Sequence, residues 1–414
     1  MTTMPHSAWS TRARTVTTSL TLLSLHLWRT VPMLTAEGCR NRRAKLWTLV
    51  NPQPDCVLLG EPRHLTYLAS FYASPFTYRS QNAPALAILT PEHAVLVADS
   101  TQRLYSQAAH VDEIIAPTWY RGRESAVDRG ALLTTTVVEQ LSRVRGRRIA
   151  VDSAVPTGVM DHLRRDGRAV EPLDIRPTIR RMERQKDADE VELMRRSVAA
   201  GEAGFRAAVE QIRPGMTEIQ AYTLIQRASV ESAGHAVLVY GDFVSGERTL
   251  RHGGPAGQRI IEPDDLFLLD FSVVVHGYRA DFANTFVVAG GRPSARQQEL
   301  AAYCLEAMHV GESLLQAGSR CRDIDAAVRE AFAKRQVDQH FTHHTGHGLG
   351  LGHPDPPYLT PESSETLVAG DIVTLEPGLY VDGVGGMRFE HNYLITQEGF
   401  QTLTHHTLGL TAMP

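Results

Sequence analysis

Short apolar runs alternate with amphipathic stretches in the part of the chain that follows residue 32. Apolar runs of four residues predict strands, and apolar residues at three- and four-residue spacing predict helices. Strands that alternate with helices indicate an α/β layer around a parallel or mixed sheet. The predicted strands are 56–59, 86–89, 94–97 and 148–151, with a helix over 131–143 between them.

The pattern becomes more helical after residue 180. A charged segment, 180–196, leads into a long amphipathic stretch that reaches Ile212 and is stopped by Pro214-Gly215. Its charge-rich start predicts a solvated helix face. Further helices are predicted over 217–232, 296–317 and 323–336.

Composition narrows the class of protein. A length of 414 residues indicates two or three domains, and 43% hydrophobic with 21% charged residues is typical of a soluble globular protein. The net charge of −4 offers no basic excess to offset phosphates, which argues against a nucleic-acid partner. The four cysteines show no metal-type spacing, and a reducing cytoplasm is the simplest location for them.

The first 32 residues differ from the rest, because no acidic residue occurs before Glu37. An apolar run, 20–28, follows Arg12 and Arg14 and resembles a poor signal or transit segment. However, His26 interrupts the run, no small-residue cleavage site follows, and the run is far too short to span a membrane. We therefore expect 1–32 to be a disordered extension, or an artefact of start-codon choice with Met33 as the true start.

Four acids and one histidine between residues 270 and 390 are candidate metal ligands. Asp270 and Glu376 each end an apolar run, Asp281 follows a Gly-Tyr turn, His347 lies between glycines, and Glu390 follows Met-Arg-Phe. Four carboxylates and one imidazole suit two divalent ions, with carboxylates bridging and positions left open for water. Taken singly, each acid is more often a turn or cap residue, and the histidine a loop residue. Their order and spacing favour the metal site.

These pieces resemble those of a known family. They are Leu-Leu-Asp-Phe at Asp270, Gly-Tyr-Arg-Ala-Asp at Asp281, Gly-His-Gly-Leu-Gly-Leu at His347, Thr-Leu-Glu-Pro-Gly at Glu376 and Gly-Gly-Met-Arg-Phe-Glu at Glu390. From about Ala188 to its end, the chain resembles the metallopeptidases of the aminopeptidase P, prolidase and methionine aminopeptidase group. The resemblance implies an α+β pita-bread catalytic domain over 181–414. It also implies a creatinase-like α/β domain over 33–180, where 67–71 is similar to an element of such domains.

The resemblance also implies roles for the site residues. Asp281 and Glu390 would bridge two metal ions, Asp270 would complete one, and His347 with Glu376 the other. Manganese is favoured over cobalt or zinc, because carboxylates dominate the ligand set. Glu376 would also carry the proton from the attacking water to the leaving nitrogen. His252 would lie near the substrate and His353 would stabilise the tetrahedral intermediate, unless either is a loop histidine without a role.

One loop departs from the family pattern. The spacing between His347 and His353 is one residue shorter than usual, and the usual His-Glu-x-Pro reads His353-Pro354-Asp355-Pro356. This departure leaves the metal ligands intact, but it means that the substrate preference can differ from that of the family. His343 and His344 have no assigned role, and Arg388 would pair with a ligand carboxylate or a substrate terminus, or form a structural salt bridge.

The predicted function is hydrolysis of the amide bond before proline at a peptide amino terminus, as in aminopeptidase P. The alternatives are an Xaa-Pro dipeptidase (prolidase) and a hydrolase of creatinase-like organisation acting on a small non-peptide substrate. A catalytically dead binding module is disfavoured, because such proteins lose several ligands and all five are present here. The expected partner is a peptide or dipeptide substrate, with no nucleic acid and no membrane, and the resemblance implies a homodimer or larger homo-oligomer.

Overall fold

The computed structural model describes residues 33–74, 84–124, 126–168 and 172–411. The expected extension, 1–32, lies outside these ranges. Leu34–Pro414 make up one compact unit. Among the described residues, no helix combines the length and the apolar character needed to cross a bilayer.

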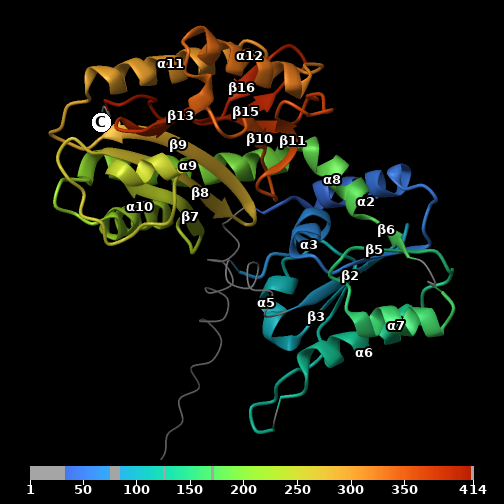
Figure 1. Cartoon of the computed structure of the whole chain (residues 1–414). Coiled ribbons are helices and arrows are strands. Elements are labelled where there is room, and N and C mark those ends of the chain that lie inside the picture. Colours follow the sequence, from blue (N-terminus) through green and yellow to red (C-terminus); the bar gives the residue numbers. More distant parts are fainter. Residues whose placement is uncertain (1–32, 75–83, 125, 169–171, 412–414) are drawn as a thin grey trace, which may run out of the picture. The chain divides into compact units, whose positions relative to one another are not determined.

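A six-stranded sheet occupies the first part of this unit, in the order β4-β3-β2-β1-β5-β6 (Figure 1). Strand β1 pairs antiparallel with β2 and parallel with β5, so the sheet is mixed, as the sequence predicts. The four predicted strands are confirmed within one residue at each end. The bounds are β1 Cys56–Leu59, β2 Ala85–Leu89, β3 Ala94–Ala98, β4 Glu113–Ile115, β5 Ile149–Val151 and β6 Leu173–Asp174.

Helices cover both faces of this sheet, which explains why β1 is apolar at every position. Val57 and Leu59 pack into a core shared with α2 and α3, while Cys56 and Leu58 pack against α6 and α7 on the other face. Successive residues of a strand point to opposite faces, so a strand covered on both sides carries no polar alternation. The bounds are α2 Ala36–Leu49, α3 Pro62–Ala69, η1 Ser100–Gln102, α5 Arg103–Ser106, α6 Arg129–Leu141 and α7 Thr157–Arg165.

Three helices follow: α8 Arg176–Arg184, α9 Ala188–Gln211 and α10 Glu218–Ala233. The expected division between residues 180 and 181 falls inside α8, and we retain the two ranges, 33–180 and 181–414, as proposed domains. The prediction that the charged start of α9 is a solvated face is wrong for Glu190, which is 1% exposed. Glu190 accepts a hydrogen bond from the Tyr278 hydroxyl at 2.9 Å, and Arg42 lies close by in the same buried network. A buried carboxylate requires such partners.

Strands β7 Leu238–Ser245, β8 Leu266–Val275 and β9 Tyr278–Val287 form an antiparallel sheet on which α9 packs. Helix α9 comes very close to β9 at Gly201, where an added Cβ would lie 2.1 Å from the Phe282 ring. Helices α9 and α10 lie together beside this sheet (Figure 1).

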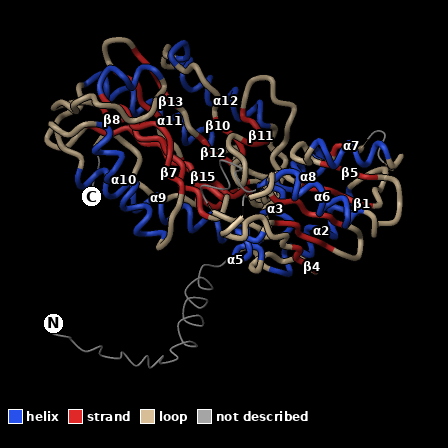
Figure 2. Tube along the Cα trace, turned by 90° about the horizontal axis from the view of Figure 1, so that it is seen from below, coloured by secondary structure: helices blue, strands red, loops and turns tan. Residues whose placement is uncertain are grey.

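A five-stranded sheet in the order β11-β10-β12-β15-β16 lies next to α11 and α12 (Figures 1 and 2). Apolar side chains of α11 and α12 share one core with Val373, Leu375 and Tyr393 of this sheet. The remaining bounds are η2 Gly246–Arg251, α11 Ala295–Glu312, α12 Cys321–Lys334, η3 Asp338–His340, β10 Gly346–Gly348, β11 Asp355–Leu359, β12 Ile372–Leu375, β13 Gly378–Val381, β14 Gly385–Arg388, β15 His391–Ile395 and β16 Phe400–Thr402.

Candidate metal centre

Asp270 on β8 and Asp281 on β9 lie on the same face of one hairpin. Asp270 pairs with Ala283, and Asp281 pairs with Ser272, in a ladder without a register shift. Asp281 is therefore two residues along β9 from the partner of Asp270, which makes the two acids diagonal neighbours. The two-residue turn at 276–277 accommodates their odd separation of eleven residues, with no bulge in the ladder.

The other three candidate ligands come from the five-stranded sheet and from the β13–β14 hairpin. His347 lies in β10, Glu376 follows β12 directly, and Glu390 follows β14. The Glu390 amide donates to the Ala283 carbonyl at 2.9 Å, which joins its strand end to β9. The Nδ1 of His347 lies 2.9 Å from the carbonyl of Gly348. This arrangement directs Nε2 into the cavity and leaves its lone pair free to bind a metal ion.

The structure brings all five side chains to one cavity of about 350 Å³. Asp270, Asp281 and Glu390 each offer an oxygen within 4.8 Å of the other two. The His347 Nε2 lies 3.4 Å from Glu376 Oε1 and 3.7 Å from Asp281 Oδ2. These atoms could ligate two adjacent ions.

The pKa values of the acids in the cavity are those expected of a cation-binding site. Burial, together with the neighbouring acids, raises the pKa of Glu390 well above its ordinary value, and its Oε1 is buried without a hydrogen-bond partner. Burial also raises the pKa of Asp270 to about 7, despite the opposing charge of Arg388. Closely spaced acids that resist ionisation, one with an orphaned oxygen, fit divalent ions, which would supply the missing positive charge.

Cationic side chains of the protein surround the same acids. Arg388 pairs with Asp270 in a very short contact and with Asp242 at 3.1 Å. The His353 Nε2 lies 2.7 Å from Asp281 Oδ2. Burial would raise the pKa of Asp281, but His353 and His347 together outweigh it and the pKa is lowered.

Glu376 has an additional partner that sequence reasoning left without a role. His344 Nε2 lies 3.0 Å from Glu376 Oε1. Burial alone would raise the pKa of Glu376, yet His344 and His347 together hold it well below its ordinary value. Glu376 is therefore ionised at neutral pH and able to accept a proton.

His252 and His343 lie at one side of the cavity beside Tyr380. The His252 ring is 4.2 Å from the Tyr380 ring, and its Nε2 is 2.7 Å from the Thr342 hydroxyl. His343 Nε2 lies 3.1 Å from the Tyr380 hydroxyl. Burial lowers the pKa of both histidines, so they are neutral at neutral pH. Tyr380 ends the family-like segment Thr-Leu-Glu-Pro-Gly-Leu-Tyr at 374–380, but no role for it was predicted from the sequence.

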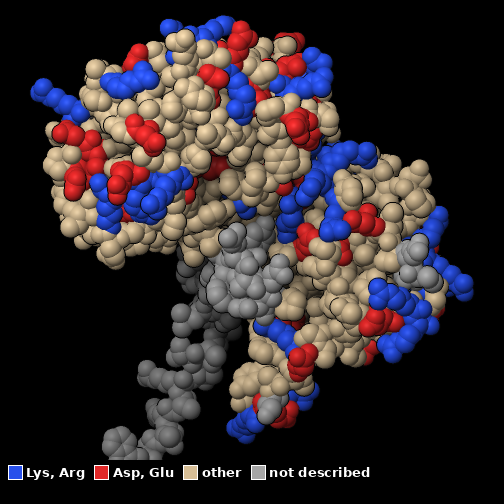
Figure 3. All heavy atoms as spheres, in the orientation of Figure 1, with Lys and Arg blue, Asp and Glu red and all other residues tan. Residues whose placement is uncertain are grey.

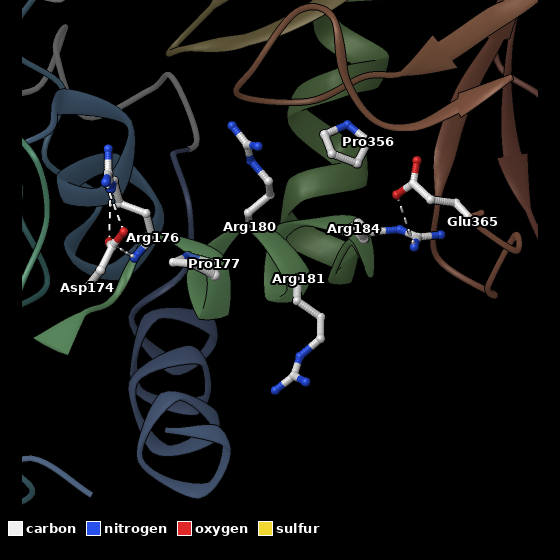
Figure 4. A pocket seen from close by; sticks show the side chains of 8 residues that line it. All are labelled: Asp174, Arg176, Pro177, Arg180, Arg181, Arg184, Pro356 and Glu365. Atoms are coloured by element: carbon white, nitrogen blue, oxygen red, sulfur yellow. Dashed lines mark hydrogen bonds and ion pairs between the residues drawn. The ribbon is translucent and has the colours of Figure 1, made fainter. Parts of the chain in front are cut away.

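A second cavity, of about 500 Å³, lies along α8 and is lined by four arginines (Figure 4). Lys and Arg also gather at the position of α8 on the face drawn in Figure 3. Arg176 pairs with Asp174 and Arg184 with Glu365, while Arg180 and Arg181 point in opposite directions. The guanidinium groups do not converge on one point, so this cavity does not form a compact anion site.

The chain is similar in sequence to known peptidases. Residues 192–397 match the model of metallopeptidase family M24. An uncharacterized peptidase of Staphylococcus aureus (strain USA300) is 29% identical over 238 residues, which are 56% of this chain and 66% of that protein. The uncharacterized peptidase YqhT of Bacillus subtilis (strain 168) is 31% identical over 224 residues, 53% of this chain and 62% of that protein. The matches thus span just under two thirds of these relatives.

Solved structures extend the likeness to both halves of the chain. The Xaa-Pro dipeptidase from Bacillus anthracis has a TM-score of 0.76 at 23% identity, covering 91% of this chain and 99% of that one. Zn-substituted aminopeptidase P of E. coli, solved in complex with product, has a TM-score of 0.71 at 20% identity, covering 90% and 96%. These likenesses show the fold, a pita-bread domain preceded by an α/β domain.

Proposed function

Because residues 192–397 form a domain of metallopeptidase family M24, we propose that this chain is a dinuclear-metal hydrolase that cleaves Xaa-Pro bonds at peptide amino termini. The observation that carries the proposal is the convergence of the five candidate ligand side chains on one cavity. Asp281 and Glu390 would hold both ions, Asp270 would hold one of them, and His347 with Glu376 would hold the other. When bound, two divalent ions supply a nucleophilic hydroxide and polarise the scissile carbonyl.

The residues of the chain would move the proton and bind the developing charge. Glu376 is ionised and hydrogen-bonded to His344. It takes a proton from the attacking water while the water oxygen forms its bond to the scissile carbonyl carbon. The same carboxyl returns that proton to the proline nitrogen as the C–N bond breaks. His353 would donate a hydrogen bond to the tetrahedral oxyanion, and His252 would lie over the substrate.

The contacts of Arg388 favour an aminopeptidase over a dipeptidase. Its Nη1 donates to the His252 carbonyl at 2.9 Å and the Tyr380 hydroxyl at 2.8 Å, while Nη2 pairs with Asp242 and Asp270. Both terminal nitrogens are thus engaged by protein groups. A dipeptide needs a cation for its terminal carboxylate close to the scissile bond, and Arg388 is poorly placed to supply it.

The test is a metal-reconstituted assay of Xaa-Pro-Xaa tripeptides, Xaa-Pro dipeptides and matched peptides without proline. We expect the tripeptides to be cleaved with the highest kcat/KM and the reaction to stop with chelator. Preferential cleavage of dipeptides would identify a prolidase instead. Full activity in chelated, metal-free protein would refute the dinuclear mechanism and favour a small non-peptide substrate.

Manganese is our proposed metal, since four of the five ligands are carboxylates. We propose a cytoplasmic location, which is supported by four cysteines that are all free and buried. The homodimer or larger homo-oligomer remains a prediction, for which light scattering is the direct measurement.

A further inference from the structure

Arg63 links α3 to the loop that carries His353. Its Nη2 lies 3.0 Å from Asp355 Oδ2, and its Nη1 lies 3.4 Å from Asp355 Oδ1. The same guanidinium also pairs with Glu183 of α8 in a very short contact. The three side chains are 22%, 12% and 8% exposed, so water screens these charges only in part. A planar guanidinium that joins two carboxylates fixes both geometrically as well as electrostatically.

Asp355 lies two residues after His353 and holds the backbone on its other side too. A Cβ added to Gly352 would lie 2.0 Å from Asp355 Oδ2, so the carboxylate packs directly on the Gly352 Cα. Asp355 is also the first residue of β11, paired with Gly348 across a register shift. The Asp355 carboxylate therefore contacts the loop between His347 and His353, whose spacing is one residue shorter than in the family pattern.

A second arginine holds the loop from the catalytic side. The Arg279 amide donates to the Gly350 carbonyl at 3.3 Å, and its Nη2 donates to the Leu351 carbonyl at 3.3 Å. Arg279 lies in β9, two residues before Asp281. One arginine thus anchors the start of the loop to β9, while Arg63 anchors its end to α3.

We propose that Arg63 is a positioning residue for catalysis: through Asp355 it holds His353 over the cavity, within 2.7 Å of Asp281. This inference rests on the proposed function and extends it, because it gives the α/β domain a direct part in the chemistry. It also explains the presence of Asp355 in the His353-Pro354-Asp355-Pro356 sequence, because its carboxylate accepts the hydrogen bonds of Arg63.

The first experiment is a set of substitutions assayed on the best Xaa-Pro peptide. Arg63→Met should lower kcat by about ten- to a hundredfold, because a misplacement of about 1 Å can cost a hundredfold. KM should change less than about twofold, since the His353 contact matters mainly in the transition state. Asp355→Asn should have the same effect, and the double variant should be no worse than either single one. Arg63→Lys, which keeps the charge but not the fork, should recover part of the loss.

Two controls separate positioning from general stability. Glu183→Gln removes the negative charge of the α8 partner but leaves the Asp355 contact, so kcat should stay at the wild-type value. Arg129→Met removes an ion pair of matched burial, to Asp99 at 2.5 Å with side chains 21% and 6% exposed, in the same domain. It should lower stability as Arg63→Met does, without changing kcat.

Hydrogen–deuterium exchange supplies a readout that needs no activity. In Arg63→Met, but not in Arg129→Met, the peptide spanning 349–355 should exchange faster. Unchanged exchange of that peptide, with kcat within about twofold of the wild type, would overturn the inference. If the wild-type protein cleaves none of the peptides, the proposed function fails, and the exchange comparison alone then decides whether Arg63 holds the loop.

Discussion

The metal-free protein should become more stable when one of its candidate ligands is neutralised. Asp270 has an ordinary pKa of 3.8, which burial raises to about 7 in the folded chain. A raised pKa means that the folded protein binds its proton more tightly than the unfolded chain does. The ionised acid therefore destabilises the metal-free fold, and this cost grows as the pH rises from about 4 to 7.

The difference between the two pKa values corresponds to about 4 kcal/mol when the acid is fully ionised, of which roughly 3 kcal/mol accumulates between pH 5 and pH 8. Asp270→Asn cannot ionise and avoids this cost. Several buried histidines, among them His343 and His391 with pKa values lowered by burial, change stability in the opposite direction over part of this range. They are common to both proteins, so they cancel in the difference between variant and wild type.

The assay is urea unfolding of both proteins at pH 5, 6, 7 and 8, with and without manganese. Without metal, the advantage of Asp270→Asn should increase steadily with pH. With saturating manganese the order should reverse, because binding to the native state stabilises only the protein that keeps its ligands. A difference that stays constant with pH, or an Asn variant that is less stable without metal at pH 8, would refute the electrostatic account of this cavity.

The remaining predictions concern catalysis and packing. Glu376→Gln should abolish turnover in a metal-reconstituted peptide assay, because it removes a ligand charge and the proton carrier; retained turnover would contradict both roles. His353→Ala should lower kcat by roughly a hundredfold while metal content by elemental analysis stays the same. If His343 or His344 proved essential in its place, the roles within this group of histidines would need to be reassigned. Gly201→Ala should lower the free energy of unfolding by about 1–3 kcal/mol in urea titrations, since its Cβ would meet the Phe282 ring at 2.1 Å; a neutral effect would mean that α9 shifts freely over β9.

Elements whose environment is uniform along their length could be predicted from the sequence. Strand β1 agrees with its prediction at both ends, because a strand buried on both faces leaves a continuous apolar run. The helix predicted over 296–317 instead ends at Glu312, although Leu315 beyond it is buried at 2% exposure. Apolar spacing records that a residue is buried but not whether the chain around it is still helical.

The residues of the candidate site also differ in whether the sequence could predict them. The five candidate ligands could be proposed because each lies in a short motif, and the structure brings all five together. Their partners could not, since His344 reaches Glu376 across 32 positions and Arg63 reaches Asp355 across 292. No local pattern marks His344 or Arg63 as the partner in these pairs, because the contact depends on how separate elements pack.

The hairpin that carries Asp270 and Asp281 makes the length of a turn part of the active site. Residues His276 and Gly277 are the only ones between β8 and β9, and the ladder on either side is regular. A one-residue insertion or deletion in this turn that shifted the pairing of β9 by one residue, without a compensating bulge, would place Asp281 on the opposite face of the sheet, while every motif remained unchanged in the sequence. Among relatives of this chain, the count of residues between the two aspartates is therefore a criterion for a working site that is independent of the ligands themselves.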